Sequence, residues 1–460
     1  MLLVDTGYSA VQHYHQPIDG DVAWNLVPAT EVDPILHDPL GLQTWRTGKT
    51  YPNPNRFFCH WGFRSYLLNL PVWLQHFVDP VRSVYLASAL AKTAVQLLLL
   101  YLLTRSIVGR QVLYALPFLG VALMLVPFFQ ASGYRSHLGI IDPSITYTFF
   151  YALPAALLLL FLLPFADHVY HRRPWKVSVL GCLLLALLGV VVCLSGPLNP
   201  GAVLVLTAVA GGYLLRKGPA ATVNHLRSLP IALVLLWALM VALSIYSLWI
   251  GRYNSLGLVE ELPLVERYAL LPAGIYRQFT QKLAFPLLFG GLALNYILLR
   301  RTRGEAAGRV LSLYTWVILF TGLYLLLLPL GGYREYRPYT LRYDTILPVT
   351  LALLLAYGAG SLRLLRTLRG HRRLGYGAVL LLIGLIFTNA DRPEFGNNAC
   401  ETAALYTLAT STRDTVPLPA DCSVISWTTS SNPADSELNA RLLVAWRITP
   451  TLKYFYNQEQ

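Results

Sequence analysis

Asp19-Gly20-Asp21 is the first group in this sequence whose residue types and spacing suit chemistry. In a turn around Gly20 the two carboxylates can converge on one divalent cation such as Mg²⁺ or Mn²⁺. Alternatively, one acts as a base while the other orients it. The competing interpretation is a solvated acidic loop with Asx turns. The bare pattern favours the loop, but apolar sequence follows directly from Trp24, which places the pair near a membrane.

A set of cationic side chains is predicted to bind an anionic ligand: Arg56, His60, Arg64, Arg334, Arg337 and Arg342. The first three recur every four residues, so they line one face of a helix. The last three lie in the run GGYREYRPYTLRYD (331–344). The planar guanidinium group of arginine suits bidentate contact with phosphate. Taken singly, each arginine could instead anchor the chain at the lipid headgroups or pair with Glu335 or Asp344.

Lys92 is a charged residue inside an apolar run, with Ser88 and Gln96 on the same helical face. A charge at such a position usually faces a helix bundle or a water-filled cavity and marks a functional site. A lysine near the outer end of the helix, with its ammonium group at the headgroups, is an equally open alternative. Lys92 is therefore added to the predicted substrate-binding residues.

The elements that position these residues belong to a very hydrophobic chain. Of 460 residues, 55% are hydrophobic and 13% are charged, against about 25% charged in an average soluble protein. One helical crossing of a bilayer needs about 20 apolar residues. The sequence therefore predicts an all-α, multi-pass membrane protein with about ten spans. They lie near 82–104, 110–130, 142–165, 175–195, 199–215, 230–250, 283–299, 310–330, 344–362 and 374–390.

Every second loop between these spans is basic. Together these basic loops contain two acidic residues, Asp167 and Glu305. Short cytoplasmic loops collect Lys and Arg, so the basic loops are predicted to be cytoplasmic and both ends of the chain non-cytoplasmic. The net charge of +13 then reflects membrane orientation and attraction to anionic lipids, with no role for nucleic acid. We expect an integral protein of a bacterial inner membrane. The basic loops carry Arg105 and Arg110; Arg172, Arg173 and Lys176; Arg216, Lys217 and Arg227; Arg300, Arg301, Arg303 and Arg309; Arg363, Arg366, Arg369, Arg372 and Arg373.

This topology divides the chain into three parts, residues 1–81, 82–390 and 391–460. Residues 1–81 form a first non-cytoplasmic segment, in which the aromatic stretch 55–78 is predicted to form one or two interfacial helices, with Pro71 as the break between two pieces. Residues 82–390 form the transmembrane bundle. The start MLLV (1–4) is typical of the end of an apolar span, so a preceding helix would bring the total to eleven.

Residues 391–460 are predicted to form a small non-cytoplasmic domain of mixed structure, in which SVISWTTSS (423–431) is typical of a strand. An oxidising compartment permits a disulfide between Cys400 and Cys422. Closing this loop would stabilise the tail by about 3 kcal/mol. Two free thiols are the alternative.

Several known motifs are absent or incomplete. TGKT (47–50) lacks the glycine spacing of a phosphate-binding loop, and no H-E-x-x-H, G-x-S-x-G or G-x-G-x-x-G occurs. Serine hydrolysis and redox chemistry with soluble cofactors therefore have no support.

With an acidic pair in the first outside loop, interfacial helices after it and many spans behind, the chain resembles the GT-C glycosyltransferases. The resemblance implies transfer of a sugar from a polyprenyl-phosphate carrier to a glycan, lipid or protein acceptor on the non-cytoplasmic face. It further implies that Asp19 and Asp21 serve as base or metal ligands, and that Arg334, Arg337 and Arg342 bind the lipid phosphate. The chain departs from the family in its missing first helix and in its short outer domain.

Two other functions fit the same features. A transporter or flippase for an anionic lipid-linked substrate would use Lys92 and the arginines to line its path, although the spans show no clear two-half symmetry. A non-catalytic membrane subunit would use the two outer segments to bind a protein partner of unknown identity. The sequence does not define the sugar or the acceptor.

Overall fold

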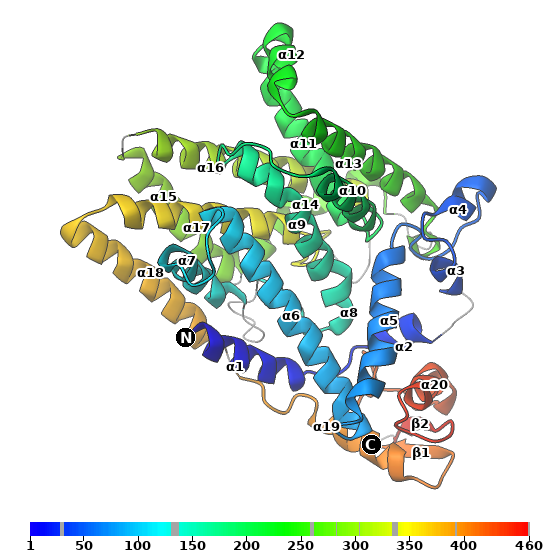
Figure 1. The fold of residues 1–460 in the computed structure, drawn as a ribbon. Coiled ribbons are helices and arrows are strands. Elements are labelled where there is room, and N and C mark those ends of the chain that lie inside the picture. The colour runs from blue at the N-terminus through cyan, green and yellow to red at the C-terminus, as the bar shows by residue number, and fades with distance from the viewer. Residues whose placement is uncertain are drawn as a thin grey trace.

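The computed structural model describes residues 1–27, 32–129, 138–257, 262–281, 283–302, 304–333, 339–391 and 393–458, and only the backbone of Ala221. The first part of the chain forms five helices beside the bundle (Figure 1). They are α1 (Leu2–Tyr14), α2 (Asp21–Leu26), α3 (Asp33–Leu36), α4 (Leu42–Thr47) and α5 (Phe57–Leu74).

The bundle that follows is built from long apolar helices. Its helices are α6 (Pro80–Val108), α7 (Leu116–Leu125), α8 (Ile145–Tyr147), α9 (Leu153–Val169), α10 (Val179–Cys193), α11 (Leu198–Arg216), α12 (Pro219–Ser228), α13 (Ile231–Ile250), α14 (Leu264–Thr280), α15 (Ala284–Arg300), α16 (Glu305–Leu327), α17 (Leu347–Thr367) and α18 (Gly370–Ala390). Single 3₁₀ turns occur at Val126–Phe129, Gly251–Tyr253, Ser255–Gly257 and Leu328–Gly331.

Seven helices among the described residues are long and apolar enough to cross a membrane. An eighth span is possible if α14 and α15, which meet at a bend of 80°, count as one broken or re-entrant crossing. Apolar helices at Leu116–Phe129 and Val179–Cys193 are shorter. A helical, multi-pass membrane architecture is therefore confirmed, and the predicted number of ten spans stays a prediction.

Three basic loops meet at the end of α6 that lies farthest from α1. The buried carboxylate of Asp167 pairs with Arg105 at 2.8 Å, Arg110 at 3.0 Å and Arg173 at 3.7 Å. Arg172 pairs with Glu305. Both acids of the predicted cytoplasmic loops thus hold basic residues of neighbouring loops together.

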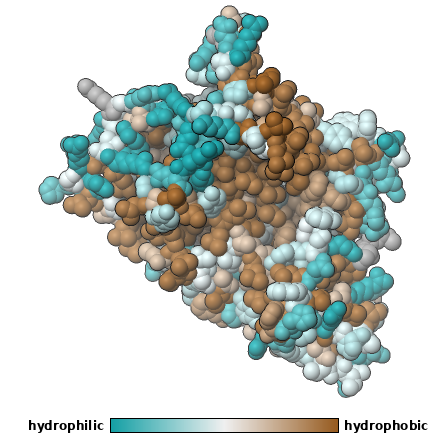
Figure 2. Space-filling model, viewed as in Figure 1, coloured by the Kyte–Doolittle hydropathy of each residue, from teal (hydrophilic) through white to brown (hydrophobic). Residues whose placement is uncertain are grey.

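Hydrophobic surface covers the bundle between two hydrophilic regions (Figure 2). One hydrophilic region lies over α12 and the junction of α17 with α18, and the other includes the C-terminal tail. A band of this kind is what a bilayer requires of a spanning protein. The sidedness of the two regions stays a prediction.

Helix α5 is continuous through Pro71, so the predicted break at this residue is wrong. A proline inside a helix removes the hydrogen bond to the carbonyl four residues earlier. Here that carbonyl belongs to Leu67, and it accepts a hydrogen bond from the indole Nε1 of Trp446 at 2.8 Å. The tail thereby satisfies the group that the proline leaves free, and α5 ends one turn later. Trp61 and Trp73 of α5 are exposed, as an interfacial helix requires.

The tail consists of α19 (Ala399–Thr410), β1 (Thr415–Leu418), a 3₁₀ turn at Pro433–Ser436, α20 (Glu437–Ala445) and β2 (Tyr454–Asn457). β1 and β2 pair in parallel, with Thr415 opposite Tyr454. A disulfide joins Cys400 to Cys422, whose Cα atoms are 5.8 Å apart. The predicted strand at 423–431 is wrong, because Ile425 adopts a left-handed conformation (φ 48°) that bends the chain.

Candidate active site

A cavity of about 990 Å³ lies where the first segment, the bundle and the tail meet. Its walls come from the turn before α2, the segments before and after the start of α8, the loop before α17, and the tail around Trp427. A π-helical turn, Thr148–Ala152, joins α8 to α9 and carries the lining residues Phe150 and Tyr151. Irregular helical turns of this kind are frequent at functional sites. The volume suits a ligand of substantial size.

Asp19 is a buried carboxylate in the wall of this cavity, held by three hydrogen bonds. Its Oδ1 accepts from the Thr146 hydroxyl at 2.7 Å and from the Asp21 backbone N–H at 3.2 Å. Its Oδ2 accepts from the Thr146 backbone N–H at 3.1 Å. These bonds fix the carboxylate and link the first segment to the start of α8.

Asp21 lines the same cavity but is held less tightly. Its Oδ1 accepts one hydrogen bond, from the indole Nε1 of Trp427 at 3.3 Å. Burial and the neighbouring Asp19 carboxylate raise the pKa of Asp21 above its usual 3.8, against the opposing effects of the Trp427 bond and of Arg342. A carboxylate with a raised pKa that faces a cavity is suited to accept a proton.

Gly20 brings Trp427 against the two aspartates. A Cβ atom at this position would lie 2.6 Å from both the backbone nitrogen and Cδ1 of Trp427. No side chain fits in that space without displacing the backbone of the tail. The glycine of the predicted Asp-Gly-Asp group therefore serves a close approach between the first segment and the tail.

Asp142 is a third carboxylate of the cavity, and the sequence prediction missed it. Its Oδ1 accepts from the Ser144 backbone N–H at 2.7 Å, while its Oδ2 is buried with no hydrogen-bond partner among the described residues. Burial raises the pKa of Asp142 to about 6. An aspartate two residues before a serine is a common loop pattern, so no local signal distinguishes this residue.

Lys92 lies directly behind the lining of the cavity. It is fully buried, and its ammonium group donates a hydrogen bond to the backbone carbonyl of Pro143. Asp19 and Asp142 both act on it electrostatically. The ammonium group therefore points into the protein and not toward the lipid headgroups. It balances two carboxylates of the site without lining the cavity itself.

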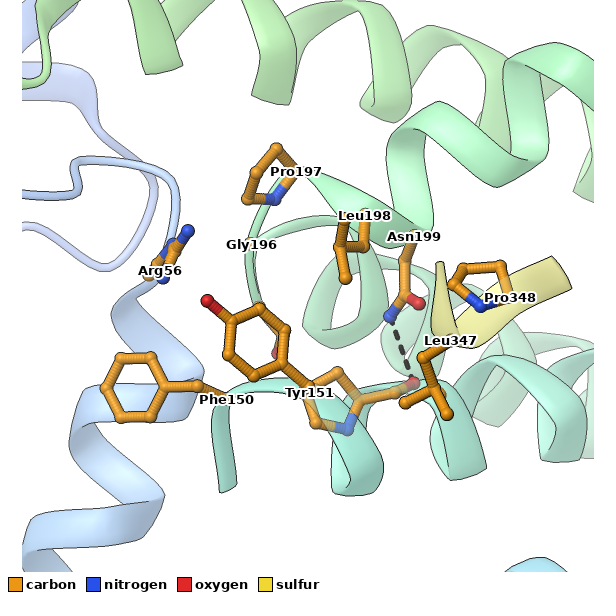
Figure 3. A pocket seen from close by; sticks show the side chains of 12 residues that line it. Arg56, Phe150, Tyr151, Gly196, Pro197, Leu198, Asn199, Leu347 and Pro348 are labelled. Atoms are coloured by element: carbon orange, nitrogen blue, oxygen red, sulfur yellow. Dashed lines mark hydrogen bonds between the residues drawn. The ribbon is translucent and has the colours of Figure 1, made fainter. Parts of the chain in front are cut away.

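Arg56 lines the cavity at the start of α5. Figure 3 shows its side chain beside Gly196, with the ring of Tyr151 close by. These residues line a small hollow next to the large cavity. On its far side, Asn199 donates a hydrogen bond to the Pro154 carbonyl at 2.9 Å. No described carboxylate forms an ion pair with Arg56. Its positive charge is therefore available to an anionic ligand.

Arg342, in the loop before α17, also lines the cavity. It forms a bidentate ion pair with the buried Asp344, at 2.9 Å to Oδ1 and 2.6 Å to Oδ2. Its guanidinium carbon lies 4.8 Å from the centre of the Tyr147 ring. The salt bridge named as an alternative from the sequence is thus present, and it holds Arg342 in the cavity wall.

The rest of the predicted cationic set is not brought together. His60 is buried with its ring 4.7 Å from that of Phe150. Burial and the charge of Arg56 lower the pKa of His60 to about 3, so it adds no positive charge near neutral pH. Arg64 is half-buried and lies outside the cavity lining. Arg334 and Arg337 lie outside the described residues.

Glu401 of α19 joins three parts of the chain behind the cavity. Its fully buried carboxyl group accepts hydrogen bonds from the Ile18 N–H at 2.9 Å, the Ile425 N–H at 2.8 Å and the Tyr85 hydroxyl at 2.8 Å. Ile18 precedes Asp19, and Ile425 lies just before Trp427 in the chain. Burial raises the pKa of Glu401 to about 7. Glu401 therefore positions both walls of the site, a role that the sequence did not reveal.

A divalent cation at this site stays a prediction. Among the residues that the structure describes, no group of three or more His, Cys, Asp or Glu side chains could hold a metal ion. Two lone-pair directions of Asp19 are already used by Thr146.

Comparison with known proteins does not assign this chain to a family. No known protein family matches this chain, and no curated protein is similar to it in sequence.

Proposed function

We propose that this protein is a membrane glycosyltransferase of the GT-C type. It would move a sugar from a polyprenyl-phosphate carrier to a glycan, lipid or protein acceptor on the non-cytoplasmic face. The observation that carries the proposal is the lining of one large cavity beside spanning helices. A carboxylate of raised pKa, Asp21, shares it with the cations of Arg56 and Arg342. Aromatic walls, including Trp24 and Trp427, suit the apolar faces of sugar rings.

In the proposed reaction, the acceptor oxygen forms a bond to the anomeric carbon of the sugar. The bond between this carbon and the phosphate oxygen breaks, and its electron pair remains on the phosphate. Arg56 and Arg342 stabilise the added negative charge. The proton of the acceptor hydroxyl passes to Asp21. Asp19, fixed by Thr146, orients the turn that carries Asp21.

The cavity also explains why a lipid carrier is a suitable donor. The lining residues Tyr147 and Phe150 belong to a segment that continues into a membrane-spanning helix, Ile145–Val169. A polyprenyl chain can therefore remain in the bilayer while its phosphate reaches the cations. A flippase for the same lipid would need these cations too, but it would not need a base.

Native mass spectrometry of protein gently extracted from its membrane tests the proposal. We expect a bound polyprenyl phosphate, or its glycosylated form, in the wild type and a clear loss of it in Arg56→Ala. Arg64→Ala, on the same helix and outside the cavity, is the matched control. We expect Asp21→Asn to retain the glycosylated carrier and to convert it at least about 100-fold more slowly.

Two results would overturn the proposal. A wild-type spectrum without any polyprenyl lipid would remove the carrier, and a second protein in its place would favour a membrane subunit. Wild-type conversion by Asp21→Asn would remove the base and favour a flippase. Asp33→Asn, an exposed carboxylate of the same segment, controls for the loss of one acidic charge.

A further inference from the structure

A second hollow lies at the other end of the bundle, between α11, α15 and α16. It has a volume of about 490 Å³. Along α16 its lining runs from Gly308 through Trp316 to Leu319, with residues spaced by three and four, so one face of this helix forms the floor. Tyr213 of α11 and Tyr296 of α15 form the walls. We call this hollow the α16 groove.

The length of the α16 groove matches half of a bilayer. From Gly308 to Leu319 the helix rises about 16 Å along its axis. The hydrocarbon region of one leaflet is about 15 Å deep, half of a core about 30 Å thick. Because α16 is a predicted span that begins at a basic loop, the groove extends from the headgroup level on the basic side to near the middle of the membrane. One extended acyl chain fits this depth.

One cation lines the groove near the end where α16 begins, and a second lies beside a ring of the groove wall. Arg300 is the last residue of α15 and lines the groove, and its guanidinium carbon lies 5.8 Å from the centre of the Tyr296 ring. Lys217 follows the last residue of α11, and its Nζ lies 4.6 Å from the centre of the Tyr213 ring. Rings that line the groove thus hold Arg300 in its wall and Lys217 beside it.

No described acid neutralises these two cations. Glu305, the nearest acid in the sequence to Arg300, pairs with Arg172 instead. No described ion pair includes Arg300 or Lys217. The floor is mostly apolar, with Leu311, Trp316 and Leu319 beside the small hydroxyls of Ser312 and Thr315. The groove therefore combines a floor of one-leaflet depth with unneutralised positive charge at headgroup level, which is complementary to a phospholipid of negative charge.

We propose that the α16 groove is a binding site for one anionic glycerophospholipid of the leaflet on the basic side of the membrane. The headgroup phosphate lies at Arg300 and Lys217, and one acyl chain lies along α16 against Trp316. This site does not depend on the proposed sugar transfer, because it shares no residue with the large cavity.

Quenching of Trp316 fluorescence by brominated lipids tests the site. The full chain is placed in phosphatidylcholine vesicles that contain increasing fractions of dibrominated phosphatidylglycerol or dibrominated phosphatidylcholine. Subtracting the signal of Trp316→Phe isolates Trp316 from the other tryptophans. We expect half-maximal quenching at a fraction of phosphatidylglycerol at least about five-fold lower, because each basic residue near the surface favours anionic lipid by about a factor of five.

Matched variants assign this preference to the groove. Lys217→Ala/Arg300→Ala should remove it, whereas Arg216→Ala/Arg301→Ala, which removes equal charge from exposed positions outside the groove, should retain it. Gly308→Leu should weaken quenching by both lipids, because a Cβ atom at Gly308 meets no protein atom within 4 Å and the side chain would fill the groove.

Three results would overturn the site. Equal quenching by the two lipids would show that the groove has no charge preference. A preference that persists in Lys217→Ala/Arg300→Ala would place the anionic lipid elsewhere. Absence of quenching by either lipid would show that protein, such as a second copy of this chain, covers Trp316.

Discussion

At the scale of residues, Asp19 and Asp21 differ in what holds them. Three hydrogen bonds fix the Asp19 carboxylate, whereas one longer bond from Trp427 holds Asp21. A base must change its hydrogen bonds when it takes up a proton, and Asp21 can do so at lower cost. Two carboxylates that are equivalent in the sequence are therefore expected to have separate roles.

We predict that Trp427→Phe moves the acid limb of the pH–rate profile to higher pH. The base acts in its ionised form, so activity falls as pH falls through the pKa of Asp21, which already lies above 3.8. The Trp427 hydrogen bond lowers this pKa, so its removal should raise the pKa further. Release of polyprenyl phosphate, followed against pH, gives the measurement.

The control for this change is Trp73→Phe, at an exposed position of α5. An acid limb that stays in place or moves to lower pH in Trp427→Phe would show that Asp21 does not set it.

We predict that Gly20→Ala lowers activity by about 100-fold, since displacement of catalytic groups by about 1 Å costs that much. The added methyl group would lie 2.6 Å from the backbone of Trp427 and must push the tail away from Asp21. Gly62→Ala, where a Cβ atom meets nothing within 4 Å, should leave activity unchanged. Equal activities of the two variants would contradict the role of the close approach.

The sequence predicted part of the lining of this cavity, because acids and arginines at membrane level stand out in an apolar chain. Asp19, Asp21, Arg56 and Arg342 all line it. It could not tell which face of α5 is buried, and so it assigned His60 a charge that burial removes. Asp142 was missed because its environment, not its neighbours in the chain, makes it unusual.

At the scale of elements, α19 controls the position of both the first segment and the tail. Glu401 accepts hydrogen bonds from Ile18, Ile425 and Tyr85. The adjacent disulfide Cys400–Cys422 ties the chain to α19 three residues before Ile425. The sequence predicted the disulfide because both cysteines lie in a segment that is expected to be non-cytoplasmic, where an oxidising environment permits the bond. It gave no sign of Glu401, because the three donors come from segments that are distant in the chain.

We predict that Glu401→Gln removes a pH dependence of stability between about pH 4.5 and 7. Burial raises the pKa of Glu401 from 4.5 to about 7 in the folded state. Its contribution to stability is therefore fully present below pH 4.5 and is lost as pH rises to 7, by up to about 3 kcal/mol. Chemical unfolding of the tail at several pH values measures this slope.

The variant's overall stability is a separate quantity, because glutamine cannot satisfy all three donors. A slope between pH 4.5 and 7 that is the same in Glu401→Gln and in the wild type would contradict the assignment to Glu401.

At the scale of the whole molecule, the large cavity and the α16 groove lie at opposite ends of the helical bundle. The basic loops gather at one end through Asp167 and Glu305, and the tail covers the other. Composition and charge predicted that the basic loops and the tail lie at opposite ends of the bundle, because a bilayer separates them. Which end faces the cytoplasm stays a prediction. The tail's packing on α5 through Trp446 and Leu67 was not predictable, because it depends on a single unpaired carbonyl.

We predict that the two ends face opposite sides of the membrane. A membrane-impermeant maleimide should label Thr412→Cys in the tail of intact cells, and should label Ser228→Cys in α12 only after the membrane is opened. Cys182 is first replaced by Ser, because the other free cysteines, Cys59 and Cys193, are buried. Labelling of both positions in intact cells, or of Ser228→Cys alone, would contradict the positive-inside orientation.

The place of Glu401 and Trp427 in the sequence also sets the order in which the cavity is completed during synthesis. Ribosomes make helices α6 to α18 before they reach these residues, and the Ile18 N–H must wait until then for its acceptor on Glu401. The disulfide beside Glu401 then forms only where the tail meets an oxidising environment. A nascent chain still being inserted thus lacks the wall of the cavity that contains Trp427, and the site is complete only after the tail has folded against the first segment.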